Sequence, residues 1–410
     1  MLPSPRFMAT QRILLVHLAN ALLLLVSCMG SKKDATIDDI FKQGKIDPKL
    51  VPTGVGYVPV LPFFKGLLHP VDVVAGYDEL IYVVDDRGLN ILDQTGAIKQ
   101  TITFSGATDV TQDRRLHTYI AARVDIVVGG QSKNVAAVFH LINTAIGSYQ
   151  IIDTLIHPFC DESRTGTGFR ADDEQVKFTG LACTADNTLL VARTGPKNTD
   201  PTANPDNTVL KFDPNGKNLG YGNGLNPNSP SLKSVLGLSS IATFAAPPQR
   251  VFGMSESQDF LITQADPRKD IEFRTLWIKF ILDPDNGNYH SENSQILNFD
   301  TTKASNFLYR PYRFANPTDI YAAPDGSGYL FIVDADSNKL YQFTQKGFEG
   351  VNPAANSSEK KQQLVSFGGK GSGPFEFDAP SGVCYFRKTV FVADRNNNRI
   401  CRYKLSTDLQ

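Results

Sequence analysis

The sequence predicts an all-β protein that is built from a repeated unit of short strands. Two observations predict it. Apolar runs of about four to eight residues, bounded by Gly, Pro, Asn and Asp, follow one another along residues 51–410, a pattern typical of strands. The segment 367–403 also recurs upstream in weaker copies, which indicates a repeat architecture. Long amphipathic helical stretches are absent from the same region of the sequence.

The C-terminal copy of the unit is the most complete. It reads FGGKGSGPFEFDAPSGVCYFRKTVFVADRNNNRICRY, with PSGV (380–383) opening a strand, VAD (392–394) ending the next strand and NRI (398–400) opening a third. This order resembles an NHL repeat. NHL repeats build β-propellers, so the resemblance implies a propeller whose blades each hold four antiparallel strands.

Upstream copies set the number of blades. Fair copies open at Pro70 and Pro317, fainter ones open at Thr108 and Thr179, and the apolar run 260–264 supplies a strand between them. The second strands of the units are predicted to end at Asp85, Arg123, Arg193, Gln264, Asp334 and Asp394. Six units of this kind predict a six-bladed propeller.

The last unit stops after its third strand, at residues 399–405. An open third strand would expose unpaired backbone groups along its length. Residues 55–61 precede the first unit and stand where a fourth strand is needed, and Pro59 is tolerated in an outermost strand because one side of that strand is unpaired. We therefore expect this N-terminal segment to close the ring.

The first residues predict export. Arg6 and Arg12 precede a short apolar stretch that ends in LVSC (25–28), which is too short for a membrane span of about 20 residues. The ending resembles a bacterial lipobox, so residues 1–27 are predicted to be a lipoprotein signal peptide, Cys28 the lipidated residue, 28–50 a tether and 51–410 the propeller. Met29 favours the outer over the inner membrane. The alternative is an ordinary signal peptide with a coincidental cysteine.

Charge indicates neither nucleic acid nor an anionic membrane surface as a partner. The chain has 41 Lys and Arg against 42 Asp and Glu, a net charge of −1. The expected partners are the membrane, through the lipid, and another envelope protein, a peptide or a glycan.

Three carboxylates are candidates for a ligand or metal site in the channel. Asp72, Asp109 and Asp319 each start the innermost strand of a unit, and innermost strands line the channel of a propeller. Oxygen ligands of this kind suit Ca²⁺. Propeller hydrolases of the gluconolactonase and paraoxonase type hold a catalytic Ca²⁺ there, although the Glu that opens their first blade has no clear counterpart here. The alternative is that these carboxylates only bond to neighbouring strands.

Two other groups of residues need an interpretation. Tyr309, Arg310, Tyr312 and Arg313 form a dense aromatic and basic run, which suits either a recognition surface or packing between blades. The histidines are scattered without ligand spacing, and no catalytic residue or cofactor other than possible Ca²⁺ is identified. The sequence thus favours a binding or scaffold module anchored in the envelope, with a calcium-dependent hydrolase or lactonase as the alternative.

Overall fold

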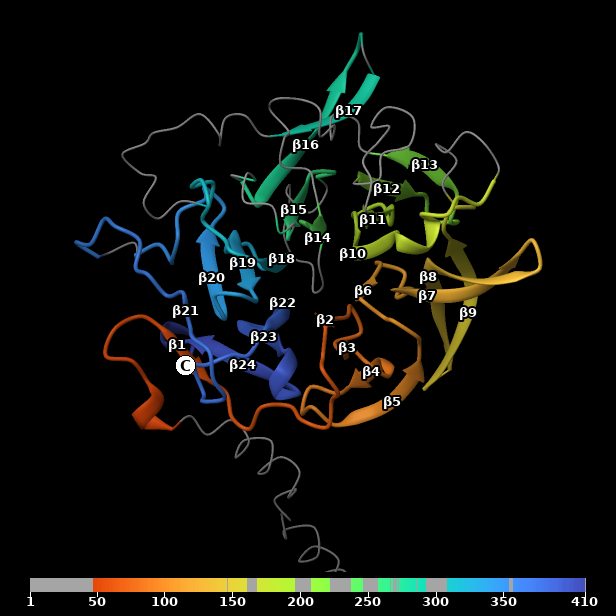
Figure 1. Cartoon of the computed structure of the whole chain (residues 1–410). Coiled ribbons are helices and arrows are strands. Elements are labelled where there is room, and N and C mark those ends of the chain that lie inside the picture. Colours follow the sequence, from red (N-terminus) through yellow and green to blue (C-terminus); the bar gives the residue numbers. More distant parts are fainter. Residues whose placement is uncertain are drawn as a thin grey trace, which may run out of the picture. The chain divides into compact units, whose positions relative to one another are not determined.

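Six four-stranded antiparallel sheets, arranged around a central channel, make up the described part of the chain (Figure 1). In this computed structural model the described residues are 47–145, 147–160, 168–195, 208–221, 237–245, 257–265, 267, 271, 273–285, 287–292, 308–353 and 357–409. All of them belong to one unit, Ile46–Gln410. The prediction of a six-bladed propeller is confirmed.

The first three blades follow one another along the chain. Blade 1 contains β2 (Asp72–Ala75), β3 (Ile81–Asp85), β4 (Gly88–Leu92) and β5 (Ile98–Thr103). Blade 2 contains β6 (Asp109–Gln112), β7 (Thr118–Val128), β8 (Gln131–Ala145) and β9 (Ser148–Ile156). Blade 3 contains β10 (Lys177–Cys183), β11 (Leu189–Thr194), β12 (Thr208–Phe212) and β13 (Asn218–Tyr221).

The other three blades complete the ring. Blade 4 contains β14 (Leu238–Thr243), β15 (Phe260–Gln264), β16 (Thr275–Asp283) and β17 (Gly287–Glu292). Blade 5 contains β18 (Pro317–Ala322), β19 (Tyr329–Asp334), β20 (Lys339–Thr344) and β21 (Phe367–Gly368). Blade 6 contains β22 (Pro380–Phe386), β23 (Thr389–Asp394), β24 (Arg399–Leu405) and, as its outer strand, β1 (Tyr57–Pro59).

The N-terminal strand closes the ring as expected. β1 pairs with β24 antiparallel, with Val58 opposite Lys404 and Pro59 opposite Tyr403. The ladder continues past Pro59, since the Val60 N–H donates to the Arg402 carbonyl at 2.8 Å. Blade 6 therefore joins the two ends of the propeller sequence, and its outer strand covers what would otherwise be an open edge.

Hydroxyl groups tie each blade to the next. Thr108, Thr179, Ser239, Thr318 and Ser381 donate to the carbonyls of Phe178, Leu238, Pro317, Pro380 and Pro70, respectively, at 2.6 to 2.8 Å. We call these five side chains the hydroxyl latches. In blades 3 to 6 the latch residue is the extra residue of a β-bulge at the start of the innermost strand. A bulge redirects a side chain, here toward the neighbouring blade.

The carboxylates at the ends of second strands are structural. Asp85, Asp334 and Asp394 are fully buried. Each accepts a backbone N–H from the loop that enters its own blade, donated by Leu68, Ala315 and Asp378, at 2.7 to 2.9 Å. Because these oxygens satisfy N–H groups that would otherwise be buried without a partner, they hold the loops rather than bind a ligand.

Blade 2 departs from the prediction. Its second strand was expected to end at Arg123, but β7 continues to Val128 and pairs with β8 up to Gln131. Gly129 and Gly130, both with positive φ, form the turn. Short 3-10 turns, η1 (Pro48–Leu50), η2 (Asp173–Gln175), η6 (Arg395–Asn397) and η7 (Ser406–Asp408), supplement the strands. Among the described residues, no helix has the length and apolar character needed to cross a membrane.

Candidate functional site

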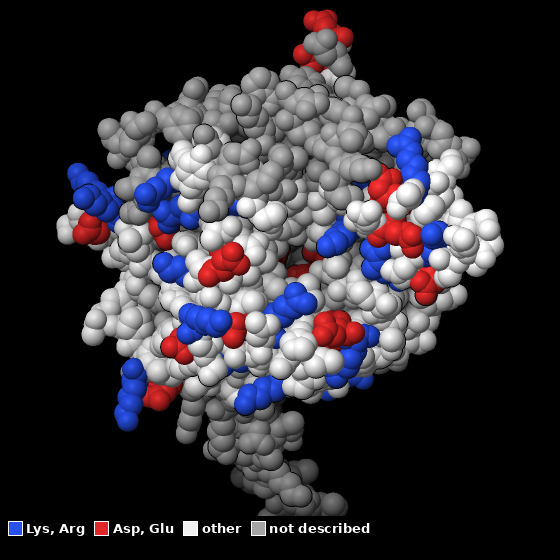
Figure 2. Space-filling view, in the orientation of Figure 1, with Lys and Arg blue, Asp and Glu red and all other residues white. Residues whose placement is uncertain are grey.

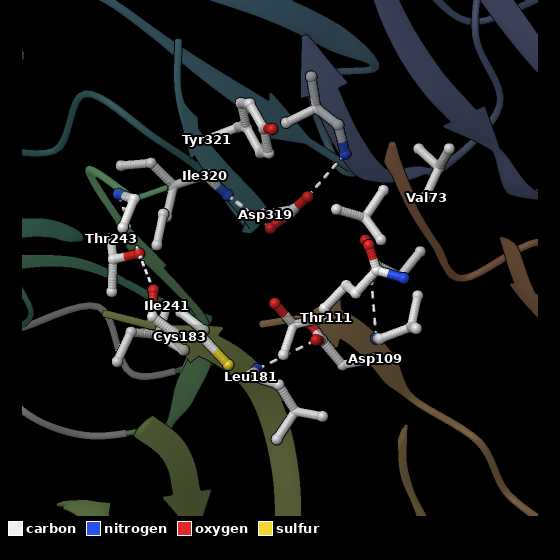
Figure 3. A pocket seen from close by; sticks show the side chains of 18 residues that line it. Val73, Asp109, Thr111, Leu181, Cys183, Ile241, Thr243, Asp319, Ile320 and Tyr321 are labelled. Carbon is white, nitrogen blue, oxygen red and sulfur yellow. Dashed lines mark hydrogen bonds between the residues drawn. The ribbon is translucent and has the colours of Figure 1, made fainter. Parts of the chain in front are cut away.

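The channel is surrounded by the innermost strands β2, β6, β10, β14, β18 and β22 (Figure 1). Asp72, Asp109 and Asp319, which we call the channel aspartates, stand at or near the starts of three of these strands, and each is 7% exposed. The structure thus places all three predicted residues around one channel, and the side chains of Asp109 and Asp319 point into it (Figure 3).

Each channel aspartate also bonds to the neighbouring blade. Asp72 accepts the Val110 N–H at 3.1 Å and Asp109 accepts the Leu181 N–H at 3.0 Å. Asp319 accepts the N–H of Val383 at 2.6 Å through one oxygen. Its other oxygen accepts the N–H of Ile320 and the hydroxyl of Ser240. The alternative role foreseen for these residues, bonding to adjacent strands, is therefore part of their geometry.

Glycine takes the place of aspartate where blades approach closely. A Cβ on Gly180 would lie 2.8 Å from the Ile241 nitrogen, and one on Gly382 would lie 2.7 Å from the Cα of Asp72. No side chain fits at such separations without a backbone shift. Ser240, which donates to Asp319, holds the same position in blade 4. This position of the repeat therefore provides a second set of contacts between neighbouring blades, beside the hydroxyl latches.

The channel aspartates are carboxylates whose charged form is unfavourable. Burial raises the pKa of Asp72 to about 6. Burial, followed by the charges of Asp72 and Asp319, raises the pKa of Asp109 well above its ordinary value. Burial and the charge of Asp72 likewise raise the pKa of Asp319. The charged form of each carboxyl group is therefore disfavoured, and a cation placed among them would lower their pKa values.

Tyr77 spans one end of the channel. This residue lies in the turn between β2 and β3, where its N–H donates to Gln112 Oε1 at 2.6 Å. Its hydroxyl donates to the Ala245 carbonyl in blade 4 at 2.9 Å, so the side chain reaches across from blade 1 to the opposite side of the ring. A cavity of about 50 Å³ extends from the channel aspartates to Gln112 and Ala245, the two residues that Tyr77 contacts, and is bordered by Thr111, Cys183 and other inner-strand residues (Figure 3). That volume holds a few water molecules.

The other end opens into a larger cavity, which we call the mouth. It has a volume of about 490 Å³ and contacts the channel aspartates, the five hydroxyl latches, Thr194, Lys177 and Arg395. Figure 2 shows the hollow near the middle of this face, with acidic atoms at its floor and basic side chains around it. Lys177 and Arg395 are exposed, and neither forms an ion pair within the described part of the chain.

The predicted calcium site is not assembled as a cluster. Among the described residues, no three His, Cys, Asp or Glu side chains lie close enough together to hold one metal ion. The channel aspartates come from blades 1, 2 and 5. One oxygen of each accepts an N–H group of the adjacent blade.

The aromatic and basic run before β18 is divided between the interior and the surface. Tyr309 is 2% exposed, whereas Tyr312 is 60% exposed and Arg310 is also exposed. Arg313 pairs with Glu349 and lies over the rings of Tyr341 and Phe343, at 5.5 and 5.6 Å from their centroids. Arg313 therefore packs within blade 5, and Tyr309 lies in an apolar cluster that blades 4 and 5 share. Arg310 and Tyr312 face outward. Cys28, the predicted lipid site, lies outside the described residues.

The structure brings together two histidines that the sequence left apart. His117 Nδ1 lies 2.8 Å from His140 Nε2, on the hairpin formed by β7 and β8. His140 is nearly buried and stacks on Tyr119 with ring centroids 4.4 Å apart. Burial, followed by the charges of His117 and Arg115, lowers the pKa of His140 to about 4. The pair is therefore neutral in the folded protein at pH 7.

The order of the strands in the six sheets decides the architecture. The chain is a six-bladed β-propeller. No protein-family profile matches it, and no curated protein matches it significantly.

Several solved structures resemble it. An auxiliary nutrient binding protein from Bacteroides ovatus has 12% identity over 88% of this chain and 75% of its own, with a TM-score of 0.45. A putative glucose dehydrogenase from Thermus thermophilus has 12% identity over 85% of this chain and 100% of its own, with a TM-score of 0.47. A putative gluconolactonase has 10% identity over 87% and 94% of the two chains, with a TM-score of 0.45. Similarities of this degree concern the fold alone.

Proposed function

We propose that the protein is a binding module, an NHL-type propeller that takes its ligand at the mouth of the channel. The observation that carries the proposal is the difference between the two ends of the channel. One end is spanned by Tyr77, whereas the other opens into a cavity of about 490 Å³. A concave site of this size, walled by convergent polar groups, suits a small ligand or the end of a larger one. The expected ligands are a protein segment, a peptide or a glycan.

The proposed location is the bacterial envelope, most simply the outer membrane, through a lipid on Cys28. The basic start, apolar stretch and LVSC ending of residues 1–28 support this proposal. Cys28→Ser should release the protein from the membrane fraction into the soluble fraction. A variant that stays in the membrane fraction would contradict the lipid anchor without affecting the proposed ligand site.

The binding proposal is tested with labelled protein on arrays of glycans and short peptides. Lys177→Trp places a large ring at the edge of the mouth and should weaken binding about tenfold or more. Lys388→Trp is the matched control, because Lys388 lies in the turn between β22 and β23, at the opposite end of its blade from Arg395. If both variants bind as the wild type does, the ligand site lies elsewhere.

A calcium-dependent hydrolase is the second candidate, because three buried carboxylates do face the channel. To coordinate an ion, their oxygens would have to leave the N–H groups of Val110, Leu181 and Val383. Thermal unfolding with Ca²⁺ and after chelation distinguishes the two candidates, since an ion that binds only the folded state raises its stability. A Ca²⁺-dependent rise that Asp109→Asn abolishes would favour the hydrolase.

A further inference from the structure

We propose that the mouth binds a small zwitterion, such as an amino acid or a short peptide, with its ammonium group at the channel aspartates and its carboxylate at Lys177 and Arg395. This inference rests on the proposed binding function and adds the chemical class and the orientation of the ligand. It follows from three properties of the mouth: the hydrogen-bonding capacity of its wall, the order of charges from floor to rim, and the closed floor.

The latch hydroxyls in the wall of the mouth offer acceptors rather than donors. Every hydroxyl latch uses its single hydrogen to reach the carbonyl of the next blade, as in the 2.7 Å bonds from Thr108 and Thr179. The oxygen of such a hydroxyl can then only accept a further hydrogen bond. The floor continues the pattern, because a carboxylate is an acceptor-only group. A ligand that enters must therefore bring donors, and an ammonium group brings three.

The charges are ordered along the axis of the mouth. The channel aspartates line the mouth and are each 7% exposed, which places them at its floor, whereas Lys177 and Arg395 line it and are exposed, which places them at its rim. A cation that enters meets opposite charge at the bottom, and an anion meets opposite charge at the top. A molecule with both groups satisfies both ends. A simple amine satisfies only the floor and a simple acid only the rim.

An ammonium group also suits the spread of the carboxylates. They project from β2, β6 and β18, three separate blades, and each already accepts a backbone N–H. A metal ion requires several oxygens at about 2.3 to 2.6 Å from one centre. Ammonium bonds of about 2.8 Å point in separate directions and need only one accessible oxygen per carboxylate. Since Tyr77 closes the channel beyond them, the ammonium is held at the floor.

Binding should release protons. The pKa of Asp72 is raised to about 6, and those of Asp109 and Asp319 are raised well above their ordinary values, so the empty site holds more protons than three exposed aspartates would. An ammonium beside a carboxylate favours its ionised form and lowers its pKa. The charged and titratable groups that face the site are Asp72 on β2, Asp109 on β6, Lys177 and Cys183 on β10, Asp319 and Tyr321 on β18, and Arg395 on η6. Because the pKa of Asp72 is raised to about 6, affinity should increase as the pH rises through that value.

The probes are dialanine and trialanine, titrated calorimetrically into the full-length protein in detergent. The N-acetyl forms lack the ammonium, and the C-terminal amides lack the carboxylate. We expect at least one free peptide to bind and its acetylated form to bind about tenfold more weakly or not at all. The amide should lose less affinity than the acetylated form. Titration in two buffers of different ionisation enthalpy should reveal proton release.

Two variants test which residues bind the ammonium group and the carboxylate of the peptide. Asp109→Asn keeps an acceptor for the Leu181 N–H and removes the charge. It should therefore weaken the binding of the free peptide and reduce the number of protons released on binding. Lys177→Met should weaken the binding of the free peptide and leave the binding of the amide unchanged. Lys388→Met is the matched control. Melting temperatures establish that each variant is folded.

The inference is overturned if neither peptide binds at about 10 mM, or if acetylation does not weaken binding. In that case, array ligands that bind the wild type but not Lys177→Trp would still support the proposed function. If no array ligand depends on Lys177 either, the proposed function fails as well.

Discussion

Asp109 affects the stability of the folded protein in two opposite ways. Its carboxylate ties blade 2 to blade 3 through the Leu181 N–H, yet its charge is unfavourable in the buried channel. A carboxyl group with a raised pKa in the folded state contributes stability that is present below its unfolded pKa and is lost as the pH rises through the folded value. The wild type should therefore lose stability, through this residue, as the pH is raised above about 4.

Asp109→Asn separates the two roles. The amide oxygen can still accept the Leu181 N–H, whereas no charge develops at high pH. We expect the variant to be more stable than the wild type by about 1 to 2 kcal/mol at pH 8, with a smaller difference at pH 5. Urea unfolding at the two pH values measures this. A difference that does not change with pH would mean that the charge of Asp109 does not affect folding.

His140 gives the opposite pH dependence. Its pKa is lowered to about 4 in the folded protein, against 6.5 as the ordinary value, so the unfolded chain binds the proton more readily. Stability from this residue is complete above pH 6.5 and is lost as the pH falls from 6.5 toward 4. The loss amounts to at most about 3 kcal/mol.

His140→Phe should reduce this acid sensitivity. The ring can still stack on Tyr119, but it cannot take up a proton. Because His117 loses its partner, the variant is expected to be less stable at pH 8 while showing a flatter dependence between pH 6.5 and pH 4.5. Chemical unfolding across this interval tests the slope, and an unchanged slope would place the acid sensitivity in other residues.

At the scale of the strand, the hydroxyl latches explain why the repeat contains Ser or Thr before the Asp or Gly. Thr179→Val removes the bond to the Leu238 carbonyl and should cost about 1 kcal/mol, whereas Thr179→Ser should cost less because it keeps the donor.

Blade 1 has Val71 where the other five blades have a hydroxyl. By the register of the other latches, Val71→Thr should donate to the Ala107 carbonyl and add about 0.5 to 1 kcal/mol. Thermal unfolding of the three variants checks the set, and equal stabilities would refute the latch.

The sequence allowed the number of blades, the closing strand and the channel aspartates to be predicted, since each depends on a local motif or on its spacing. The role of the latch hydroxyls could not be predicted, because it depends on the β-bulge that turns them toward the next blade. The sequence of a single repeat does not reveal such a bulge. The innermost strand of blade 4 was not located, because Leu238 replaces the proline that opens the better copies. Its Ser239-Ser240-Ile241 triplet is the signal that would have found it.

Contacts between strands and across the ring could not be predicted from the sequence for a different reason. His117 and His140 meet because β7 and β8 pair in one register, and the length of that hairpin was mispredicted. Tyr77 lies in an ordinary turn, and its role depends on the width of the ring and on the position of Ala245 across it. Such distances are set only when all six blades are closed.

For the whole molecule, the bond from Tyr77 to Ala245 connects opposite sides of the ring and separates the channel from one face. Cys183 reports on this closure. It borders the inner cavity and is 4% exposed, and burial raises the pKa of its thiol well above the ordinary value. A thiol in this state reacts slowly because both access and the thiolate form are limited.

Tyr77→Ala should open the channel and increase the rate at which a small methanethiosulfonate reagent modifies Cys183 by about tenfold or more. Tyr77→Phe keeps the ring and should stay close to the wild-type rate, although it loses the hydroxyl bond. Peptide mass spectrometry identifies the modified residue, and the buried Cys384 and Cys401 of blade 6 serve as internal controls for general unfolding. If Cys183 reacts no faster in Tyr77→Ala, the inner strands alone seal the cavity. If all three cysteines react faster, Tyr77 instead stabilises the ring as a whole, as expected of a side chain that braces blade 1 against blade 4.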